Sequence, residues 1–355
     1  MSDTLVTLLP WRRLIVVSVV LPLLGMLVVL AFAWPAAQIG PRDLPVGVVG
    51  ASPATQQVTA GLTRSEPGGF SVRRYANEAS ARTAIERRDI YGAFVVSPGR
   101  VTVLEASAAS PTVAQLVSTV GQQLADHIAA NAQPRSAIQV TSVDVAPTSA
   151  SDPHGLVLGI APLPLSIFGV LMAVAIMMVA RFRLAWRQLV ALLIVSVAGG
   201  LGDYLIVQGF LGALPGAPAA TWASLALTIL AVSAPAAGLI SLMGPAGLAV
   251  GAVLMVVVGN AFSAATSAPQ LLPAAVGRIG QWLPAGAGGE LLRSTAYFHG
   301  NDAAGHLSVL IIWSVLGLVA VFAGQRFPSR FRQGPARPGT GAEQDQPANV
   351  PLLNP

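Results

Sequence analysis

Six apolar stretches divide the chain, and each reaches or approaches the roughly 20 residues that a helix needs to cross a bilayer. Arginines or polar turns flank these stretches, and their interiors carry almost no charge. They predict six transmembrane helices, at about residues 14–34, 158–180, 189–211, 221–243, 246–265 and 307–324. We therefore expect an α-helical polytopic membrane protein.

Three arginine clusters indicate how the predicted helices are oriented. One cluster precedes the first helix, one lies between the second and third helices, and one follows the sixth. Because short cytoplasmic flanks are enriched in Lys and Arg, six crossings that start in the cytoplasm place all three clusters inside. Both termini are then cytoplasmic. The clusters are Arg12 and Arg13; Arg181, Arg183 and Arg187; and Arg326, Arg330 and Arg332.

The first apolar stretch has two interpretations. The letters AFA at 31–33 resemble the A-x-A cleavage site of a signal peptide. A signal peptide usually has an apolar region of about 7–15 residues, and this one is nearer 20. We therefore favour an uncleaved anchor, with a cleaved signal peptide as the alternative.

A polar segment between the first and second helices, residues 39–155, has the pattern of an α/β domain. Short β-rich runs predict strands at 44–50, 70–76, 91–97, 100–107 and 137–145. A helix is expected at 77–89 with Asn77 as its N-cap, and another from Pro111. The order β-α-β-α-β-β-α-β predicts a small extracytoplasmic α/β domain inserted between transmembrane helices 1 and 2.

The segment 268–300 breaks the apolar pattern before the last helix. Apolar residues at helical spacing in 272–283 predict one amphipathic helix, which Pro284 ends. A turn at 285–289 and a second short helix at 290–297 would follow. Trp282 suits the headgroup level. We expect a re-entrant or amphipathic hairpin at the outer interface; a surface loop with an amphipathic stretch is the alternative.

These patterns divide the chain into four parts. Residues 1–38 hold the N-terminal stub and the first helix, and 39–155 the outer α/β domain. Residues 156–325 hold helices 2–6 and the hairpin. Residues 326–355 form a cytoplasmic tail rich in Pro, Gly, Gln and Asn, which we expect to be disordered.

Composition excludes several classes of function. The chain is 54% hydrophobic and 10% charged, against about 25% charged in soluble domains. It has no Cys and no Lys, so it has neither a cysteine metal site nor a nucleotide-binding P-loop. Its four His are scattered, and no metalloprotease or serine-hydrolase motif occurs. We expect no catalytic residues, no metal, no cofactor and no binding of nucleic acid.

Two acids stand out as candidate site residues. Asp203 is the one acid well inside a predicted helix, where a carboxylate costs about 2.5–3.5 kcal/mol. It is a substrate-path candidate, with Gln208 as its partner; a structural hydrogen bond near the interface is the alternative. Glu290 and Arg293 are three residues apart, so they can form a local ion pair. They either orient the hairpin or form an outer gate.

Two further sets of residues complete the candidates. Trp282 and Pro284 belong to the outer hairpin and its proposed gate. Arg181, Arg183 and Arg187 would dock acidic residues of a partner or anionic lipid headgroups. Simple topogenic charge is the alternative for these arginines.

The layout resembles that of ABC-2-type transporter permeases, in the branch with a large outer domain that includes YhgE/Pip-like membrane proteins. Before the last helix, members of this family tend to have a Pro, an amphipathic helix, "LP" and "LLR"-like residues. Here these are Pro269, Leu271–Pro273, Trp282–Pro284 and Leu291–Arg293. The runs LPVGVVG at 44–50 and EASARTAIERRDIYGAFVVSPG at 78–99 are also similar to the outer domain of that branch.

The resemblance implies a permease-like subunit of an ABC-type exporter in the cell membrane. It would move an amphipathic or lipid-like substrate, powered by a separate ATPase subunit, and would work as a dimer of permease halves within the lipid bilayer. The alternative is a non-transport cell-envelope or secretion-associated membrane protein whose outer domain binds a partner.

Overall fold

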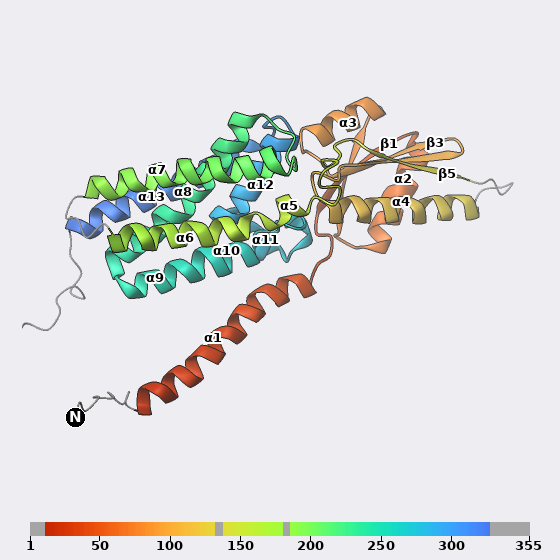
Figure 1. Ribbon diagram of the computed structural model, residues 1–355. Coiled ribbons are helices and arrows are strands. Elements are labelled where there is room, and N and C mark those ends of the chain that lie inside the picture. Colours follow the sequence, from red (N-terminus) through yellow and green to blue (C-terminus); the bar gives the residue numbers. More distant parts are fainter. Residues whose placement is uncertain (1–10, 132–137, 180–184, 327–355) are drawn as a thin grey trace, which may run out of the picture.

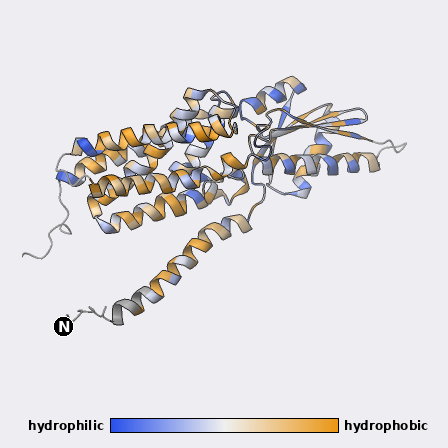
Figure 2. Cartoon of the chain, in the orientation of Figure 1, coloured by the Kyte–Doolittle hydropathy of each residue, from blue (hydrophilic) through white to orange (hydrophobic). Residues whose placement is uncertain are grey.

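A bundle of long helices and a five-stranded sheet lie end to end in the computed structural model (Figure 1). The structure describes residues 11–131, 138–179 and 185–326. The bundle is coloured as hydrophobic along most of its length, whereas the sheet region mixes hydrophilic and hydrophobic positions (Figure 2). Each region has its own apolar core, so the chain has two parts with different surfaces.

The sheet region follows α1 (Trp11–Ala37) and precedes α5 (Leu156–Ile160). Its strand order is β2-β1-β3-β4-β5, with β3 and β4 antiparallel and the other pairs parallel. The predicted element order and the Asn77 N-cap are confirmed. The elements are β1 (Leu44–Val49), α2 (Ser52–Ser65), β2 (Phe70–Tyr75), α3 (Glu78–Glu86), β3 (Gly92–Ser97), β4 (Arg100–Glu105), α4 (Pro111–Asn131) and β5 (Gln139–Asp144).

Helices cover both faces of the sheet. Successive side chains of a strand point to opposite faces, and here both faces carry apolar side chains that need to be buried. Leu44, Val46 and Val48 of β1 face α2 and α4 and form a core with them. Ile85 of α3 and Ala93 of β3 belong to the core on the opposite face. The sheet is therefore buried between two helical layers.

Five helices are long and apolar enough to cross a membrane in the described part of the chain. Four of them form the bundle with α8 at its centre, where 67% of the apolar window is buried. The first, α1, leans away from the bundle, and only 6% of its window is buried (Figure 1). The bundle helices are α5 with α6 (Pro162–Val179), α7 (Ala185–Tyr204) with the π-helix η1 (Leu205–Phe210), α8 (Pro218–Met243) and α13 (Ala303–Arg326).

The fifth predicted stretch, 246–265, forms a shorter helix than expected. It folds as α9 (Pro245–Ala252), the π-helix η2 (Val253–Val258) and α10 (Gly259–Ala261), so the helical run ends at residue 261. Asn260 and Ser263 end it, since Asn260 Nδ2 donates to Val256 O and Ser263 Oγ to Asn260 O. Where six long apolar helices were predicted, the described part of the chain has five and one shorter apolar helix.

Two other expectations cannot be compared with the structure. The tail at 327–355, including Arg330 and Arg332, lies outside the described residues. So do Arg181 and Arg183.

Candidate functional site at the junction of sheet and bundle

The segment between α10 and α13 holds three short helices at the junction between the sheet and the bundle: η3 (Pro269–Leu271), α11 (Ala274–Gln281) and α12 (Pro284–Tyr297). A helix ends just before Pro284, as predicted, since α11 stops at Gln281, but the predicted turn at 285–289 is wrong. Pro284 begins α12, which continues without a break to Tyr297. Proline is well tolerated at the first position of a helix, where its missing N–H would have no partner.

Close packing explains why a glycine-rich run is helical in α12. A Cβ on Gly288 would stand 2.5 Å from Thr228 Cγ2 on the central helix α8. A Cβ on Gly280, in α11, would stand 1.7 Å from the carbonyl oxygen of Phe262. These glycines admit a backbone approach that no larger residue permits. Tertiary packing therefore overrides the low helix propensity of glycine.

Glu290 of α12 is buried and lies between two guanidinium groups. Its Oε1 accepts a hydrogen bond from Arg293 of the same helix, and its Oε2 accepts one from Arg88 of the sheet region. Both arginine side chains are almost fully buried. The predicted ion pair between Glu290 and Arg293 is present, and Arg88 turns that local pair into a bridge between the sheet region and the bundle.

Arg88 occupies a backbone position that usually belongs to glycine. It is the second residue after the end of α3, following the C-cap Arg87, and has φ of 66°. The N–H groups of Arg88 and Asp89 donate to the carbonyl oxygens of Ile85 and Ala84, the pattern of a Schellman helix end. A non-glycine residue in this conformation costs of order 1 kcal/mol or more. From this position the guanidinium of Arg88 donates a hydrogen bond to Glu290.

The surroundings of Glu290 keep its carboxylate charged. Burial alone would raise its pKa, but the nearby charges of Arg293 and Arg88 and the hydrogen bond from Arg88 outweigh it. The pKa of Glu290 is lowered to about 2. Burial raises the pKa of the neighbouring Tyr91 phenol, so that group stays neutral. The junction is therefore a network of fixed charges at neutral pH.

Further hydrogen bonds connect the sheet region to the segment between α10 and α13. Tyr91 Oη donates to Gln270 Oε1 at 2.9 Å, and Asn301 Nδ2 donates to the carbonyl oxygen of Glu86 at 3.0 Å. Arg42 Nη1 donates to the carbonyl oxygen of Leu271 at 2.8 Å. The residues from 268 to 301 thus bind the sheet region along its whole base.

The same segment also completes the two cores of the sheet region. Ala268 and Leu271 belong to the core on the side of α2 and α4. Phe298 belongs to the core on the side of α3, and the Arg88 guanidinium lies 5.4 Å from the centre of its ring. The sheet region is therefore not packed as a separate unit, because residues between 268 and 298 fill part of its interior.

The two remaining hairpin candidates have different surroundings. The side chain of Pro284 is buried at the start of α12. Trp282 is 68% exposed, and its carbonyl oxygen accepts a hydrogen bond from Trp313 Nε1 of α13 at 2.7 Å. The backbone at Trp282 therefore ties α11 to the last long helix, while its ring faces outward.

The two substrate-path candidates are not partners. Gln208 Nε2 donates to the carbonyl oxygen of Gly216 at 2.6 Å, so the expected pairing with Asp203 is wrong. Among the described residues no hydrogen bond or ion pair holds Asp203, which is half-buried in α7. The π-helix η1 begins two residues later and changes the direction in which the following side chains point.

One of the three candidate coupling arginines is described. Arg187 lies in the first turn of α7, where its guanidinium is 5.7 Å from the centre of the Trp186 ring. Arg181 and Arg183 lie outside the described residues. This part of α7 lies at the end of the bundle away from the sheet (Figure 1).

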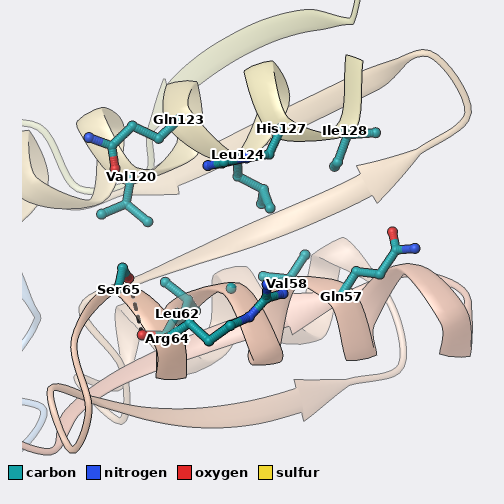
Figure 3. A pocket seen from close by; sticks show the side chains of 11 residues that line it. Gln57, Val58, Leu62, Arg64, Ser65, Val120, Gln123, Leu124, His127 and Ile128 are labelled. Carbon is teal, nitrogen blue, oxygen red and sulfur yellow. Dashed lines mark hydrogen bonds between the residues drawn. The ribbon is translucent and has the colours of Figure 1, made fainter. Parts of the chain in front are cut away.

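A second site is a groove on the sheet region between α2 and α4, with a volume of about 780 Å³. Val58 and Leu62 of α2 and Val120 and Leu124 of α4 face the space between the two helices (Figure 3). Polar side chains form its rim, among them Arg64. Clefts of 300–1,000 Å³ are typical of small-molecule sites.

Sequence reasoning missed the residues that join the two regions. Arg88, Tyr91 and Asn301 belong to short polar runs between elements, and nothing in their spacing links them to Glu290. It also missed the groove, because α2 has a weakly apolar sequence. Within the described ranges, no group of three or more His, Asp or Glu could hold a metal ion.

Residues 12–187, just under half of the chain, match the family described as ABC-2 family transporter protein. No curated protein matches the chain. The match covers α1, the sheet region, α6 and the start of α7. Together with the long apolar helices, it identifies a multi-pass membrane protein that is similar to ABC-2 transporter permeases.

Proposed function

We propose that the chain is the membrane-spanning subunit of an ABC-type exporter that moves an amphipathic or lipid-like substrate. The family match supports a transport subunit, and permeases of this family generally work with an ATPase partner in a membrane. The branch would be the one with a large outer domain, the YhgE/Pip-like proteins.

One observation carries the proposal: α12 belongs to the bundle and to the sheet region at the same time. It packs against α6, α8 and α13, and its Glu290 pairs with Arg88. A displacement of the bundle helices would therefore reach the sheet region directly. Buried ion pairs that break and re-form between two arrangements are a common feature of switching proteins. In this proposal Glu290, Arg293, Trp282 and Pro284 form an outer gate.

The arrangement of the helices supports six crossings with both termini on the cytoplasmic side. α1 begins and α13 ends at the end of the bundle away from the sheet (Figure 1). The run α9–α10 lies alongside α6 and spans about 25 Å at 1.5 Å per residue. That length is near the lower limit for a membrane helix. With this topology the sheet region is extracytoplasmic.

The end of the bundle away from the sheet would then face the ATPase. α6 ends and α7 begins there; Arg181 and Arg183 lie between these helices in the sequence, and Arg187 lies in the first turn of α7. Arginine suits such a contact because its guanidinium binds carboxylates in a fixed geometry. The splayed helix α1 would pack against a second permease half, since little of it is buried in one copy.

The substrate path would include Asp203. Ionisable residues inside membrane helices commonly mark substrate or ion pathways. Asp203 has no bonded partner among the described residues, so its carboxylate is available to a substrate group or a proton. Gln208 would line the same path near the outer end of α7.

The groove between α2 and α4 favours a second candidate, a non-transport envelope protein whose outer domain binds a partner. The two candidates differ in their need for ATP. A transport subunit needs an ATPase bound near the link between α6 and α7, whereas a binding protein does not.

Reconstitution distinguishes the two candidates. The full chain is purified with its bound proteins and placed in liposomes that contain a short-chain fluorescent phospholipid. The proposal expects an ATPase to co-purify and ATP to speed movement of the probe between leaflets. Replacing the three link arginines by Gln should abolish co-purification. An ATP-independent signal without a bound ATPase would contradict the proposal.

A further inference from the structure

The groove between α2 and α4 has apolar side chains along the α4 wall that the fold leaves partly exposed. Val58 and Leu62 are buried beneath it, while Val120, Leu124 and Ile128 remain partly exposed along its wall. The two helices lie apart on one face of the sheet, and no further element of the described chain fills the space between them (Figure 3). A cleft of this size with apolar side chains along one wall can accommodate a hydrocarbon chain.

The rim of the groove carries a positive charge and no negative one among the described residues that line it. Arg64 lines it, and none of the eleven residues that line it in the described part of the chain is acidic. Arg64 Nε donates to the carbonyl oxygen of Ala60 at 3.1 Å, and no acidic side chain of the described residues pairs with Arg64. Gln57 and Gln123 add neutral hydrogen-bonding groups. The rim is thus complementary to an anion.

One residue of α2 keeps the groove open. A Cβ on Gly61 would meet no atom within 4 Å, so no close packing requires glycine there. Glycine weakens a helix interior relative to other residues. Its place in the wall of the groove instead leaves room that a larger side chain would fill.

From these observations we propose that the groove binds a single-chain anionic amphiphile. Its hydrocarbon chain lies along Val120, Leu124 and Ile128, and its anionic head lies beside Arg64. The guanidinium is well suited to a carboxylate or phosphate, which it can bind through two parallel hydrogen bonds. This site does not depend on the proposed transport, because it lies wholly within the sheet region.

The test uses the full chain in nanodiscs of neutral phospholipid. The probes are a photoreactive palmitate and the matching photoreactive palmityl alcohol, and mass spectrometry locates the labelled residues. We expect palmitate to label residues 52–65 and 111–131. Gly61→Leu should reduce this labelling at least fivefold, and Thr63→Leu, on the exposed side of α2, should leave it unchanged.

A second pair of variants tests whether the groove requires a negative charge on the probe. Arg64→Gln should lower labelling by palmitate several-fold and leave labelling by the alcohol unchanged, whereas Arg74→Gln, on the exposed surface of β2, should change neither. Equal labelling of the wild type and Gly61→Leu would overturn the proposal. It would also be overturned if Gly61→Leu reduced dimers seen by mass photometry without changing the labelling, because a second copy would then occupy the groove.

Discussion

Two acids near the end of the bundle that adjoins the sheet have opposite surroundings. Glu290 is buried in α12 between Arg88 and Arg293, and its neighbours hold its pKa at about 2. Asp203 is half-buried in α7 and has no bonded partner among the described residues. A fully paired charge holds two regions together, whereas an unpaired one is free to meet a ligand. The comparison assigns structural coupling to Glu290 and leaves Asp203 as the residue on the proposed path.

The packing around the two acids differs in the same way. Gly280, in α11 beside α12, has no room for a Cβ, whereas Gly202, next to Asp203, has no atom within 4 Å of that position. The junction is close-packed and specific. The side of α7 that carries Gly202 is open, and a π-helix follows the end of α7.

The largest effect should follow from Glu290→Ala. The substitution leaves two buried arginines without their carboxylate, and removal of one partner from a buried ion pair costs about 3–5 kcal/mol. Unfolding of the purified protein followed by tryptophan fluorescence measures this. Glu78→Ala, which breaks an exposed pair with Arg82, is the control and should cost about 0.3–0.5 kcal/mol. Equal effects of the two substitutions would contradict the assigned role.

Acidification should weaken the same network. The pKa of Glu290 in the folded protein, about 2, lies below the usual value of about 4.3 for Glu. The contribution of the ionised Glu290 to the free energy of unfolding is therefore fully present above pH 4.3. It is lost as the pH falls toward 2, by up to about 3 kcal/mol. Unfolding measured at pH 7, 5, 4 and 3 tests this. The decline should be shallower in Glu290→Gln, and a parallel decline in both proteins would exclude Glu290 as its source.

Substitution of Gly280 and of Gly202 by Ala should change the free energy of unfolding in opposite directions, because Gly280 is closely packed and Gly202 is not. Gly280→Ala places a methyl group against the Phe262 carbonyl, and such overpacking typically costs about 1–3 kcal/mol. Gly202→Ala meets open space within a helix and should stabilise by about 0.5–1 kcal/mol. Unfolding of both variants under one condition gives the comparison. The idea of a tightly packed junction fails if Gly280→Ala is as stable as the wild type.

The smallest effect on stability should come from Asp203→Asn. No hydrogen bond or ion pair is lost among the described residues, so the free energy of unfolding should change by no more than about 0.5 kcal/mol. Transport of the fluorescent phospholipid should nevertheless fall several-fold at unchanged expression. Full transport activity in this variant would remove Asp203 from the proposed path.

Periodicity predicted the elements well where local sequence controls them. The strands, α3 with its Asn77 N-cap and α4 all lie where alternation and helical spacing indicate. The wrong prediction at 285–289 has a tertiary cause, because the glycines of α12 are helical only through their packing against α8 and the α10–α11 region. The fifth apolar stretch ends early since Asn260 and Ser263 take up its last carbonyl groups.

The candidate site could be predicted only in part. The spacing of Glu290 and Arg293 indicates a local ion pair. The bridge to Arg88 joins residues 202 positions apart, and no local pattern reports a contact of that range. A polar residue between α3 and β3 gives no sign that its backbone adopts a left-handed conformation and aims its side chain at the bundle.

A double-mutant cycle between Arg88 and Glu290 tests most directly whether the sheet region is tied to the bundle through these two side chains. Unfolding free energies of Arg88→Gln, Glu290→Gln and the double variant give the coupling energy. The structure predicts a coupling of about 1–3 kcal/mol, because each single substitution breaks the same buried ion pair. Additive effects, with a coupling below about 0.5 kcal/mol, would contradict the proposed link between the two regions.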